Sequence, residues 1–169
     1  MNELQIKDLE NLKDIDYQKL YKLHLLLPKN DQMSYKNFIN EFNSQNREYF
    51  FAIIENSIVG YIGIMDAIDA YEIIGIVVDE NYQNMGIGKK LLDCTKIFAQ
   101  KNKRSLIALE VDEKNDKAIK FYKNFGFQVT NIRKKYYRDN DAYVMHYYLW
   151  ILHTKKQTFI SWCLVMHKN

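Results

Sequence analysis

The stretch IVVDENYQNMGIGKKLL, residues 76–92, joins an apolar run to a turn with two glycines, Gly86 and Gly88. The apolar run predicts a buried strand over residues 72–78. Apolar residues then recur at helical spacing, which predicts a helix over residues 86–101. Free amides at the start of such a helix, together with the positive end of its dipole, favour a bound anion. The stretch therefore predicts a phosphate-binding turn between a strand and a helix.

Two common phosphate-binding motifs do not fit this turn. A Walker A loop is excluded because Gln83 stands where its first glycine should be and Lys90 where its Ser or Thr should be. The dinucleotide fingerprint is excluded because Leu91 occupies the position of its third glycine. A purely structural turn and a turn that binds a nucleotide remain the alternatives.

The rest of the chain alternates strands and helices around this unit. The first half predicts a strand, two helices and a hairpin whose tight turn is Asn56 and Ser57. The second half alternates strands and helices. This order predicts a mixed sheet with helices packed against it, which is an α/β (α+β) fold. The predicted strands are 4–9, 49–55, 58–65, 105–111, 127–136 and 142–149, and the other predicted helices are 14–27, 34–42 and 116–124.

Length and composition indicate a globular protein. The 169 residues favour one domain, and 47% hydrophobic with 27% charged residues exclude disordered, collagen-like and coiled-coil classes. Cys94 and Cys163 cannot make a disulfide framework, so we expect a reducing, cytoplasmic compartment. No signal peptide is visible at the N-terminus. The longest apolar stretch, 143–152, is about half of the ~20 residues in a membrane-spanning helix, so no membrane association is expected.

Charge is distributed unevenly along the chain. Residues 1–88 carry 7 Lys and Arg against 14 Asp and Glu, whereas residues 89–169 carry 17 against 7. Such a chain could face a cation with its first half and a polyanion with its second. A solvated surface is the alternative.

Further stretches make the pattern specific. Residues 76–92 are followed by LEV at 109–111, by NDKAIKFY at 115–122 and by FGF at 125–127. In this order they resemble the GCN5-related N-acetyltransferase (GNAT) superfamily. The resemblance implies the GNAT fold, a central mixed, mostly antiparallel sheet of about seven strands flanked by about four helices.

A finer resemblance lies towards the end of the chain. RKKYYRD at 133–139 followed by DAYVM at 141–145 is similar to the bacterial ribosomal-protein alanine N-acetyltransferases of the RimI type. The resemblance implies a single acetyltransferase domain over residues 1–150. Residues 151–169 leave the family pattern, so we expect a C-terminal extension of unknown role there.

The resemblance also implies acetyl-CoA as cosubstrate. We expect no metal, because the spacing of His146, His153, Cys163 and His167 fits no zinc pattern. The pyrophosphate of acetyl-CoA would rest on the amides of the turn, with Lys89 and Lys90 nearby. The backbone of the strand before the turn would pair with the pantetheine arm as an added strand. Asn115 matches a family position that touches the cosubstrate, and an N-cap is its alternative role. The implied cosubstrate-binding residues are Ile76, Val77, Val78, Gln83, Asn84, Met85, Gly86, Ile87, Gly88, Lys89, Asn115 and Tyr122.

Acetyl transfer to an amine needs a base for the attacking ammonium and an acid for the departing thiolate, and we expect Glu110 and Tyr122 in these roles. Alternation puts Glu110 on one strand face with Leu106 and Ala108, where desolvation would raise the pKa of its carboxyl towards that of a useful base. A salt bridge to a neighbouring lysine is the alternative. Tyr122, with an ordinary pKa of about 10, stays protonated and can donate. A core tyrosine with a satisfied hydroxyl is the competing interpretation.

The acceptor can be weighed by the free energy of freeing an amine. Deprotonating a lysine ammonium at pH 7 costs about 4.6 kcal/mol, against about 1 kcal/mol for an α-amine. With the resemblance, this favours direct transfer in a ternary complex to the N-terminal α-amine of a protein, such as a ribosomal protein. Tyr136, Tyr137 and Arg138 match the family's stretch near the peptide groove and are candidates for substrate contact.

Other acceptors and one other class of protein stay open. A GNAT enzyme could act on lysine, a polyamine or an antibiotic, and a non-enzymatic module could sense acyl-CoA through the same turn. We expect a monomer or dimer. We expect no direct contact to nucleic acid, because coenzyme A and ribosomal surroundings account for the basic stretch 114–138 equally well.

Overall fold

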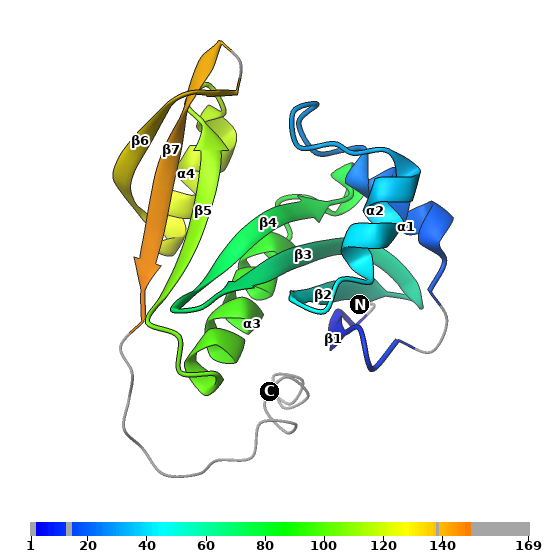
Figure 1. Ribbon diagram of the computed structural model, residues 1–169. Helices are drawn as coiled ribbons and strands as arrows, with labels where there is room; N and C mark the ends of the chain where they lie inside the picture. Colours follow the sequence, from blue (N-terminus) through cyan, green and yellow to red (C-terminus); the bar gives the residue numbers. More distant parts are fainter. Residues whose placement is uncertain (1–2, 13–14, 138, 150–169) are drawn as a thin grey trace.

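The computed structural model describes residues 3–12, 15–137 and 139–149. Seven strands form one sheet in the order β1-β2-β3-β4-β5-β7-β6 (Figure 1). Every neighbouring pair is antiparallel except β4 and β5, which are parallel. The predicted mixed, mostly antiparallel sheet with four helices is confirmed. The strands are β1 Gln5–Asp8, β2 Arg47–Ile54, β3 Ser57–Ala67, β4 Ala70–Val78, β5 Leu106–Asp112, β6 Gln128–Tyr137 and β7 Asn140–Tyr148, and the helices are α1 Tyr17–His24, α2 Tyr35–Phe42, η1 Glu80–Tyr82, α3 Ile87–Lys101 and α4 Asp116–Phe125.

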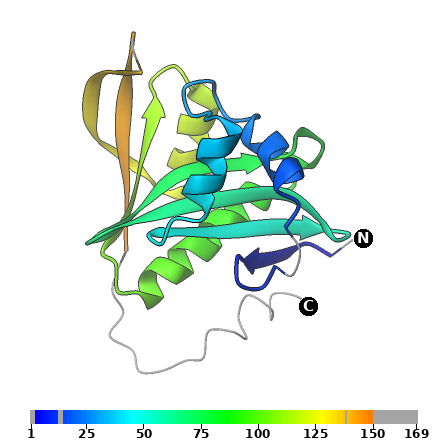
Figure 2. The same ribbon diagram turned by 45° about the vertical axis from the view of Figure 1, so that its right-hand side comes forward.

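The sheet is covered on both faces, because the strands at its centre are apolar on both sides. In β2, Phe50 and Ala52 belong to a core that includes α3 and α4, whereas Tyr49 and Phe51 belong to a second core with α1 and α2. Figures 1 and 2 show α1 and α2 in front of the sheet and α3 behind it. The period of two along one strand therefore separates the two layers of helices.

The sheet opens between its two parallel strands. β4 and β5 pair only from Ala70 with Leu106 to Ile73 with Leu109. β4 continues to Val78 while pairing with β3 alone, and β5 continues while pairing with β7. Figure 1 shows the two strands diverging towards their carboxyl ends. Ligands bind outside the carboxyl ends of parallel strands where the sheet offers such a crevice, so the opening marks the candidate site.

A bulge lies where the opening begins. Ile64 pairs with Ile73 and Gly63 pairs with Gly75, so Ile74 is an extra residue on β4. Such a residue reverses which side chains face each side of a strand. Before the bulge, Ile73 packs towards α3, and after it Val77 packs towards α1 and α2.

Most predicted ends of strands and helices are shifted by one or two residues in the structure, and two differences have a clear physical cause. The predicted helix 14–27 is shorter in the structure, because the backbone changes to turns after His24 and Pro28 disfavours a helical residue before it. The hairpin turn lies one residue earlier than predicted, at Glu55 and Asn56, both of which have positive φ. That pair of angles is what a two-residue turn between twisted strands requires.

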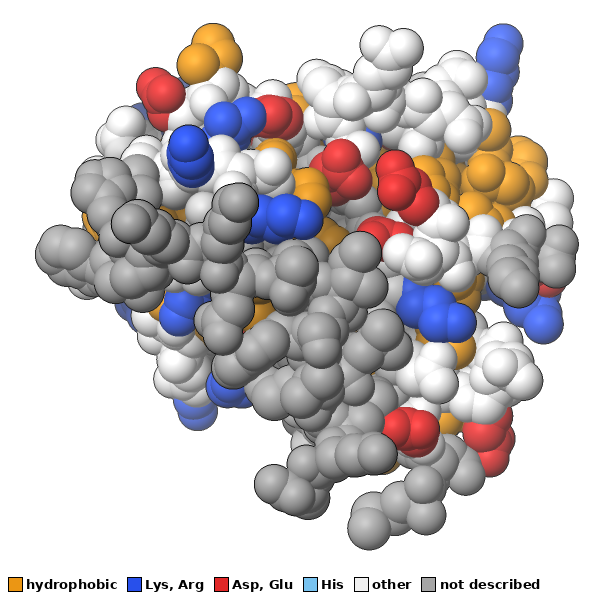
Figure 3. Space-filling view, turned by 90° about the horizontal axis from the view of Figure 1, so that it is seen from below, with side chains coloured by type: hydrophobic (Ala, Val, Ile, Leu, Met, Phe, Trp, Pro, Cys, Tyr) orange, Lys and Arg blue, Asp and Glu red, His pale blue; other side chains and the backbone are white. Residues whose placement is uncertain are grey.

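Folding brings the acidic first half and the basic second half of the chain together. Arg104, after α3, binds Asp66 at the end of β3, with 2.5 Å between Nη2 and Oδ2. Seen from below (Figure 3), acidic and basic side chains lie near one another on the described part of this face. Cys94 is buried in α3. The predicted extension 151–169 and Cys163 lie outside the described residues.

Within the described part of the chain, no helix is long and apolar enough to cross a membrane. The same part contains no group of three His, Cys, Asp or Glu side chains arranged as metal ligands.

The turn between β3 and β4 generates a stability prediction. Ile68 lies in this turn with φ of 54° and is 86% exposed. The left-handed region costs a residue with a Cβ about 1–2 kcal/mol. We predict that Ile68→Gly raises the free energy of unfolding by about 1 kcal/mol in urea titrations, after the entropic cost of glycine is subtracted.

Ile132→Gly is the matched control, because Ile132 is an exposed isoleucine on β6 without positive φ. It should lower the free energy of unfolding. A similar loss in both variants would contradict the strain at Ile68.

Candidate active site

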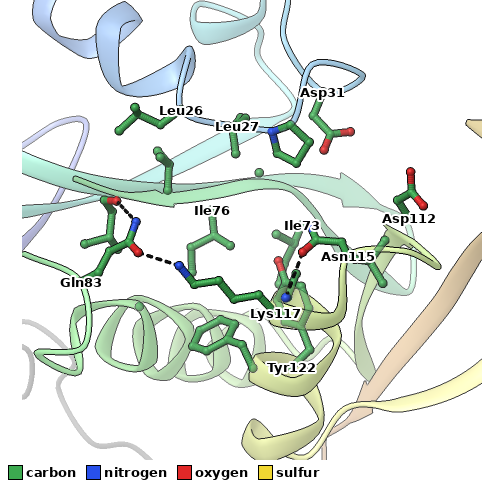
Figure 4. Close-up of a pocket in the computed structure, with 18 of the residues that line it drawn as sticks. Leu26, Leu27, Asp31, Ile73, Ile76, Gln83, Asp112, Asn115, Lys117 and Tyr122 are labelled. Atoms are coloured by element: carbon green, nitrogen blue, oxygen red, sulfur yellow. Dashed lines mark hydrogen bonds between the residues drawn. The ribbon is translucent and has the colours of Figure 1, made fainter. Parts of the chain in front are cut away.

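A cavity of about 1390 Å³ occupies the opening between β4 and β5. Single ligands usually occupy pockets of about 300–1000 Å³, so this one has room for two reactants. Its walls come from the loop between α1 and α2, from β4, from the turn before α3, from α4 and from the ends of β5 and β6. In Figure 4, Leu26, Leu27 and Asp31 lie on one side of β4, and Lys117 and Tyr122 on the other.

The start of α3 forms one end of the cavity. Its N-cap is Gly86, with φ of 78°, and no side chain caps the first-turn amides. A Cβ at Gly86 would have no heavy atom within 4 Å, so the glycine meets the backbone angle and leaves open space beside the amides. Asn84 also has positive φ, at 62°. Uncapped amides at the start of a 15-residue helix suit the phosphates of a ligand.

Gly88 has a different structural role. A Cβ there would lie 3.1 Å from Cζ of Phe121 on α4. This glycine therefore permits α3 and α4 to pack closely. The side chain of Ile87 is buried in the core, so only its backbone could serve a ligand.

A hydrogen-bonded bridge links the turn to α4. Gln83 Nε2 donates to the carbonyl oxygen of Val78 at 3.1 Å, and Lys117 Nζ donates to Gln83 Oε1 at 2.7 Å (Figure 4). Lys117 lines the cavity, and its bond to Gln83 places a cation at the turn before α3. Lys89 lines the cavity too, although its ammonium is paired with Asp93 at 2.9 Å.

Glu110 lies near the end of β5, with its side chain 13% exposed. One carboxylate oxygen accepts a hydrogen bond from Arg133 of β6, so its partner is an arginine and not the neighbouring lysine of the predicted alternative. Tyr136 also bonds to Glu110, and this bond is the main cause of the raised pKa of Tyr136. Glu72 on β4 is close by, and its pKa is raised first by burial and then by the charge of Glu110. The Glu110 carboxylate is thus largely buried, hydrogen-bonded by side chains of β6 and close to a second carboxylate, that of Glu72.

Tyr122 reaches the cavity from α4. Its ring packs edge-on against Phe127, with centroids 5.5 Å apart, and burial raises the pKa of the phenol above its ordinary value. Among the described residues, no side chain or backbone group forms a hydrogen bond with its hydroxyl. The described region holds no fully buried side-chain oxygen or nitrogen without a partner, so this hydroxyl has access to the cavity. The phenol is protonated and available to a ligand.

The loop between α1 and α2 supplies the opposite wall. Asp31 faces Tyr137 at the end of β6 and lies near Asp112 at the end of β5. Burial is the largest cause of the raised pKa of Asp31, and Asp112 adds to it, while a hydrogen bond with Tyr137 opposes it. Burial and the charge of Asp31 together raise the pKa of Tyr137. This end of the cavity is therefore acidic.

The structure brings nearly all the predicted residues to one cavity. Glu110, Tyr122, Tyr136, Tyr137 and Asn115 line it, as do Lys89 and the predicted backbone positions of β4 and α3. Asn115 caps α4 as well, since its Oδ1 accepts from the amide of Ala118 at 3.1 Å. The residues that do not line it are Met85, whose side chain is 62% exposed, and Lys90, and Arg138 lies outside the described residues.

Several residues of the site were not predicted from the sequence: Asp31, Glu72, Asp112, Lys117 and Arg133. Asp31 belongs to a loop whose sequence carries no motif. Glu72 was visible only as the polar start of an apolar strand. The pairing of Glu110 with Arg133 depends on β6, which reaches β5 only through β7. No local spacing could have predicted it.

Comparisons with known proteins agree with this geometry. Residues 8–127 match the acetyltransferase (GNAT) family. The chain is 37% identical over 114 residues to the N-alpha-acetyltransferase RimI of Mycobacterium tuberculosis, covering 64% of this chain and 70% of that protein. It is 30% identical over 152 residues to an N-alpha-acetyltransferase of Saccharolobus solfataricus, covering 81% and 90%.

A solved structure shares the fold. The ribosomal-protein-S18-alanine N-acetyltransferase of Escherichia coli superposes with a TM-score of 0.73 at 22% identity, over 93% of this chain and 99% of that one. The family match covers more than half of the chain, and it includes the strand, turn and helix that form the cavity. The chain belongs to the acetyltransferase (GNAT) family and is an N-acetyltransferase that uses acetyl-CoA as donor.

Proposed function

We propose that this enzyme acetylates the N-terminal α-amine of a protein, with a ribosomal protein as the first substrate to test. The observation that carries the proposal is the acidic end of the cavity, where Asp31, Glu72, Glu110 and Asp112 come together from a loop and two strands. Such a group attracts a cationic amine. The names of the relatives, N-alpha-acetyltransferase in both organisms, support the same acceptor.

The donor would occupy the other end of the cavity. The amides at the start of α3 would hold its pyrophosphate, with Lys117 and Lys89 contributing positive charge. The edge of β4 from Ile76 to Val78, which has no strand partner on the side of β5, would pair with the pantetheine arm. The acetyl end would then lie near the bulge at Ile74.

Acetyl-CoA supplies an acetyl group activated as a thioester. A backbone amide beside the bulge would polarise the thioester carbonyl, and oxyanion donors of this kind are typically worth about 3 kcal/mol. Glu110 would take the proton of the attacking ammonium, directly or through water, with Arg133 and Tyr136 holding its carboxylate in place. Tyr122 would give a proton to the departing sulfur and regain one from the attacking nitrogen, which loses its second proton as the amide forms.

The α-amine is the nucleophile that this site can free most easily. The acid groups stabilise an ammonium and thereby oppose its deprotonation, so an amine with a low starting pKa has the advantage. An α-amine needs about 1 kcal/mol to lose its proton at pH 7, against about 4.6 kcal/mol for lysine.

An acceptor panel tests this function. We predict that a peptide with the N-terminal sequence of a ribosomal protein releases free coenzyme A in a thiol assay, with product acetylated at the α-amine by mass spectrometry. The same peptide with a blocked N-terminus and a free lysine is the control and should react about 400-fold more slowly at equal intrinsic reactivity, as a difference of about 2.6 units in amine pKa requires. Turnover of a polyamine without turnover of any peptide would overturn the proposed acceptor.

A second prediction concerns the acid. Tyr122→Phe removes only the hydroxyl, so kcat should fall about 100-fold, within the range for a positioned proton donor, while the Kd of acetyl-CoA changes little. Tyr143→Phe is the matched control, because Tyr143 packs against the core and does not line the cavity. Equal kcat values in the two variants would remove Tyr122 from the mechanism.

A further inference from the structure

His24, the last residue of α1, is a buried imidazole with both ring nitrogens engaged. Its side chain lies between α1, α2 and β3, and the residue is only 3% exposed. The backbone amide of Met33 donates to Nε2 at 3.0 Å. Nδ1 lies 3.1 Å from the hydroxyl oxygen of Tyr61 on β3. One ring therefore joins the end of a helix, the loop that follows it and the central sheet.

These contacts determine the state of the ring. Nε2 must carry a lone pair, because the Met33 amide can only donate. The proton of a neutral ring then lies on Nδ1, which donates to Tyr61. Protonation would place an N–H group opposite the N–H of Met33, and two donors repel one another. The hydrogen bond to Met33 thus requires neutral His24.

The surroundings favour the neutral ring. Tyr21 stacks on it with centroids 5.9 Å apart, and Phe38 of α2 lies at 4.9 Å. Burial lowers the pKa of His24. Besides Tyr61 and Tyr21, the titratable groups that line a small cavity of about 240 Å³ with His24 are Glu41 of α2 and Tyr49 of β2. Glu41 is already paired, with 2.9 Å between its Oε2 and Nε of Arg47.

Met33 is the far end of the loop that walls the acceptor side of the main cavity. Residues 26–32 of this loop, with Asp31 among them, line that cavity. The loop is closed upon itself by Gln32, whose Nε2 donates to the carbonyl oxygens of Leu25 at 2.9 Å and Leu27 at 2.7 Å. Tyr21 donates to the carbonyl oxygen of Met33 at 3.0 Å. Both backbone polar groups of Met33 are thus held by side chains of α1.

We propose that neutral His24 is a positioning residue for the acceptor, which acts through Met33 to hold the loop 25–33 and its Asp31 at the acidic end of the cavity. The inference rests on one part of the proposed function, namely that the acceptor enters at the acidic end of the main cavity. His24 lines the small cavity behind the loop and does not line the main one, so it touches no reactant.

Two substitutions separate this role from simple packing. In His24→Gln, Oε1 can take the place of Nε2 and accept from Met33, whereas the shorter side chain of His24→Asn reaches only the position of Nδ1. Losing the bond should raise the acceptor KM about tenfold in the Asn variant, as expected for one hydrogen bond of about 1.4 kcal/mol. The acetyl-CoA KM should stay within about twofold, and the Gln variant should restore the acceptor KM to within about threefold of the parent.

Hydrogen exchange of the Met33 amide, followed by NMR, gives a readout that needs no acceptor. Its protection factor should fall in the Asn variant and remain in the Gln variant. In the parent, the protection factor of the Met33 amide should also fall with decreasing pH, at a pH below 6.5, the ordinary pKa of the imidazole. Because burial lowers the pKa of His24, the ring is neutral at pH 6.5 and becomes protonated only at a lower pH. The Gln variant should lack this acid dependence.

His146→Asn is the matched control, since His146 lies on β7 and does not line either cavity. It should leave the acceptor KM and the Met33 amide unchanged. Equal protection of Met33 in the Asn and Gln variants, or an acetyl-CoA KM that rises as much as the acceptor KM, would overturn the proposal. If the peptide fails as a substrate and another amine is turned over, that amine serves in the KM measurement, so the two proposals fail separately.

Discussion

The candidate active site exists because two parallel strands, β4 and β5, pair over only part of their length. β4 and β5 form four residue pairs and then separate. Beyond that point β4 pairs only with β3, and β5 pairs only with β7. An unpaired strand edge inside a protein is costly, because its amides and carbonyls need partners. Here the edge faces a cavity of about 1390 Å³ in which a ligand can supply them. The extra residue at Ile74 lies where the separation begins and sets which side chains of β4 face each helical layer.

The opening separates two electrostatic environments. Towards α3 it offers uncapped helix amides, with Lys117 in reach of the turn. Towards the loop between α1 and α2 it offers carboxylates, of which Asp31 and Glu72 have raised pKa values because they are buried near other acids. An anionic donor and a cationic acceptor would therefore enter at opposite ends and meet near the bulge. Glu110 and Tyr122 line the same cavity, from β5 and α4.

Those parts of the fold that depend on residues close together in the chain could be predicted from the sequence. The strand, turn and helix of residues 72–101 could be predicted because an apolar run, positive-φ glycine and helical periodicity all lie within one stretch. The hairpin turn was misplaced by one residue because Glu55, an uncommon residue in the left-handed region, adopts positive φ.

The part of the site that long-range contacts create was not predictable. Arg133 meets Glu110 across two strand pairings, and Asp31 meets Tyr137 across the cavity. The role of Met33 follows from a hydrogen bond to His24, nine residues away on the other side of a loop. The resemblance to a family indicated Glu110 and Tyr122, but it gave no indication of the groups that hold them.

The central claim is that the free edge of β4 and the start of α3 together receive the donor. Backbone amide exchange with and without acetyl-CoA tests it most directly. Added acetyl-CoA should increase the protection of amides in residues 76–78 and 87–89, with smaller changes elsewhere in the sheet. Unchanged protection in both segments at saturating acetyl-CoA, with new protection on another surface, would contradict the account.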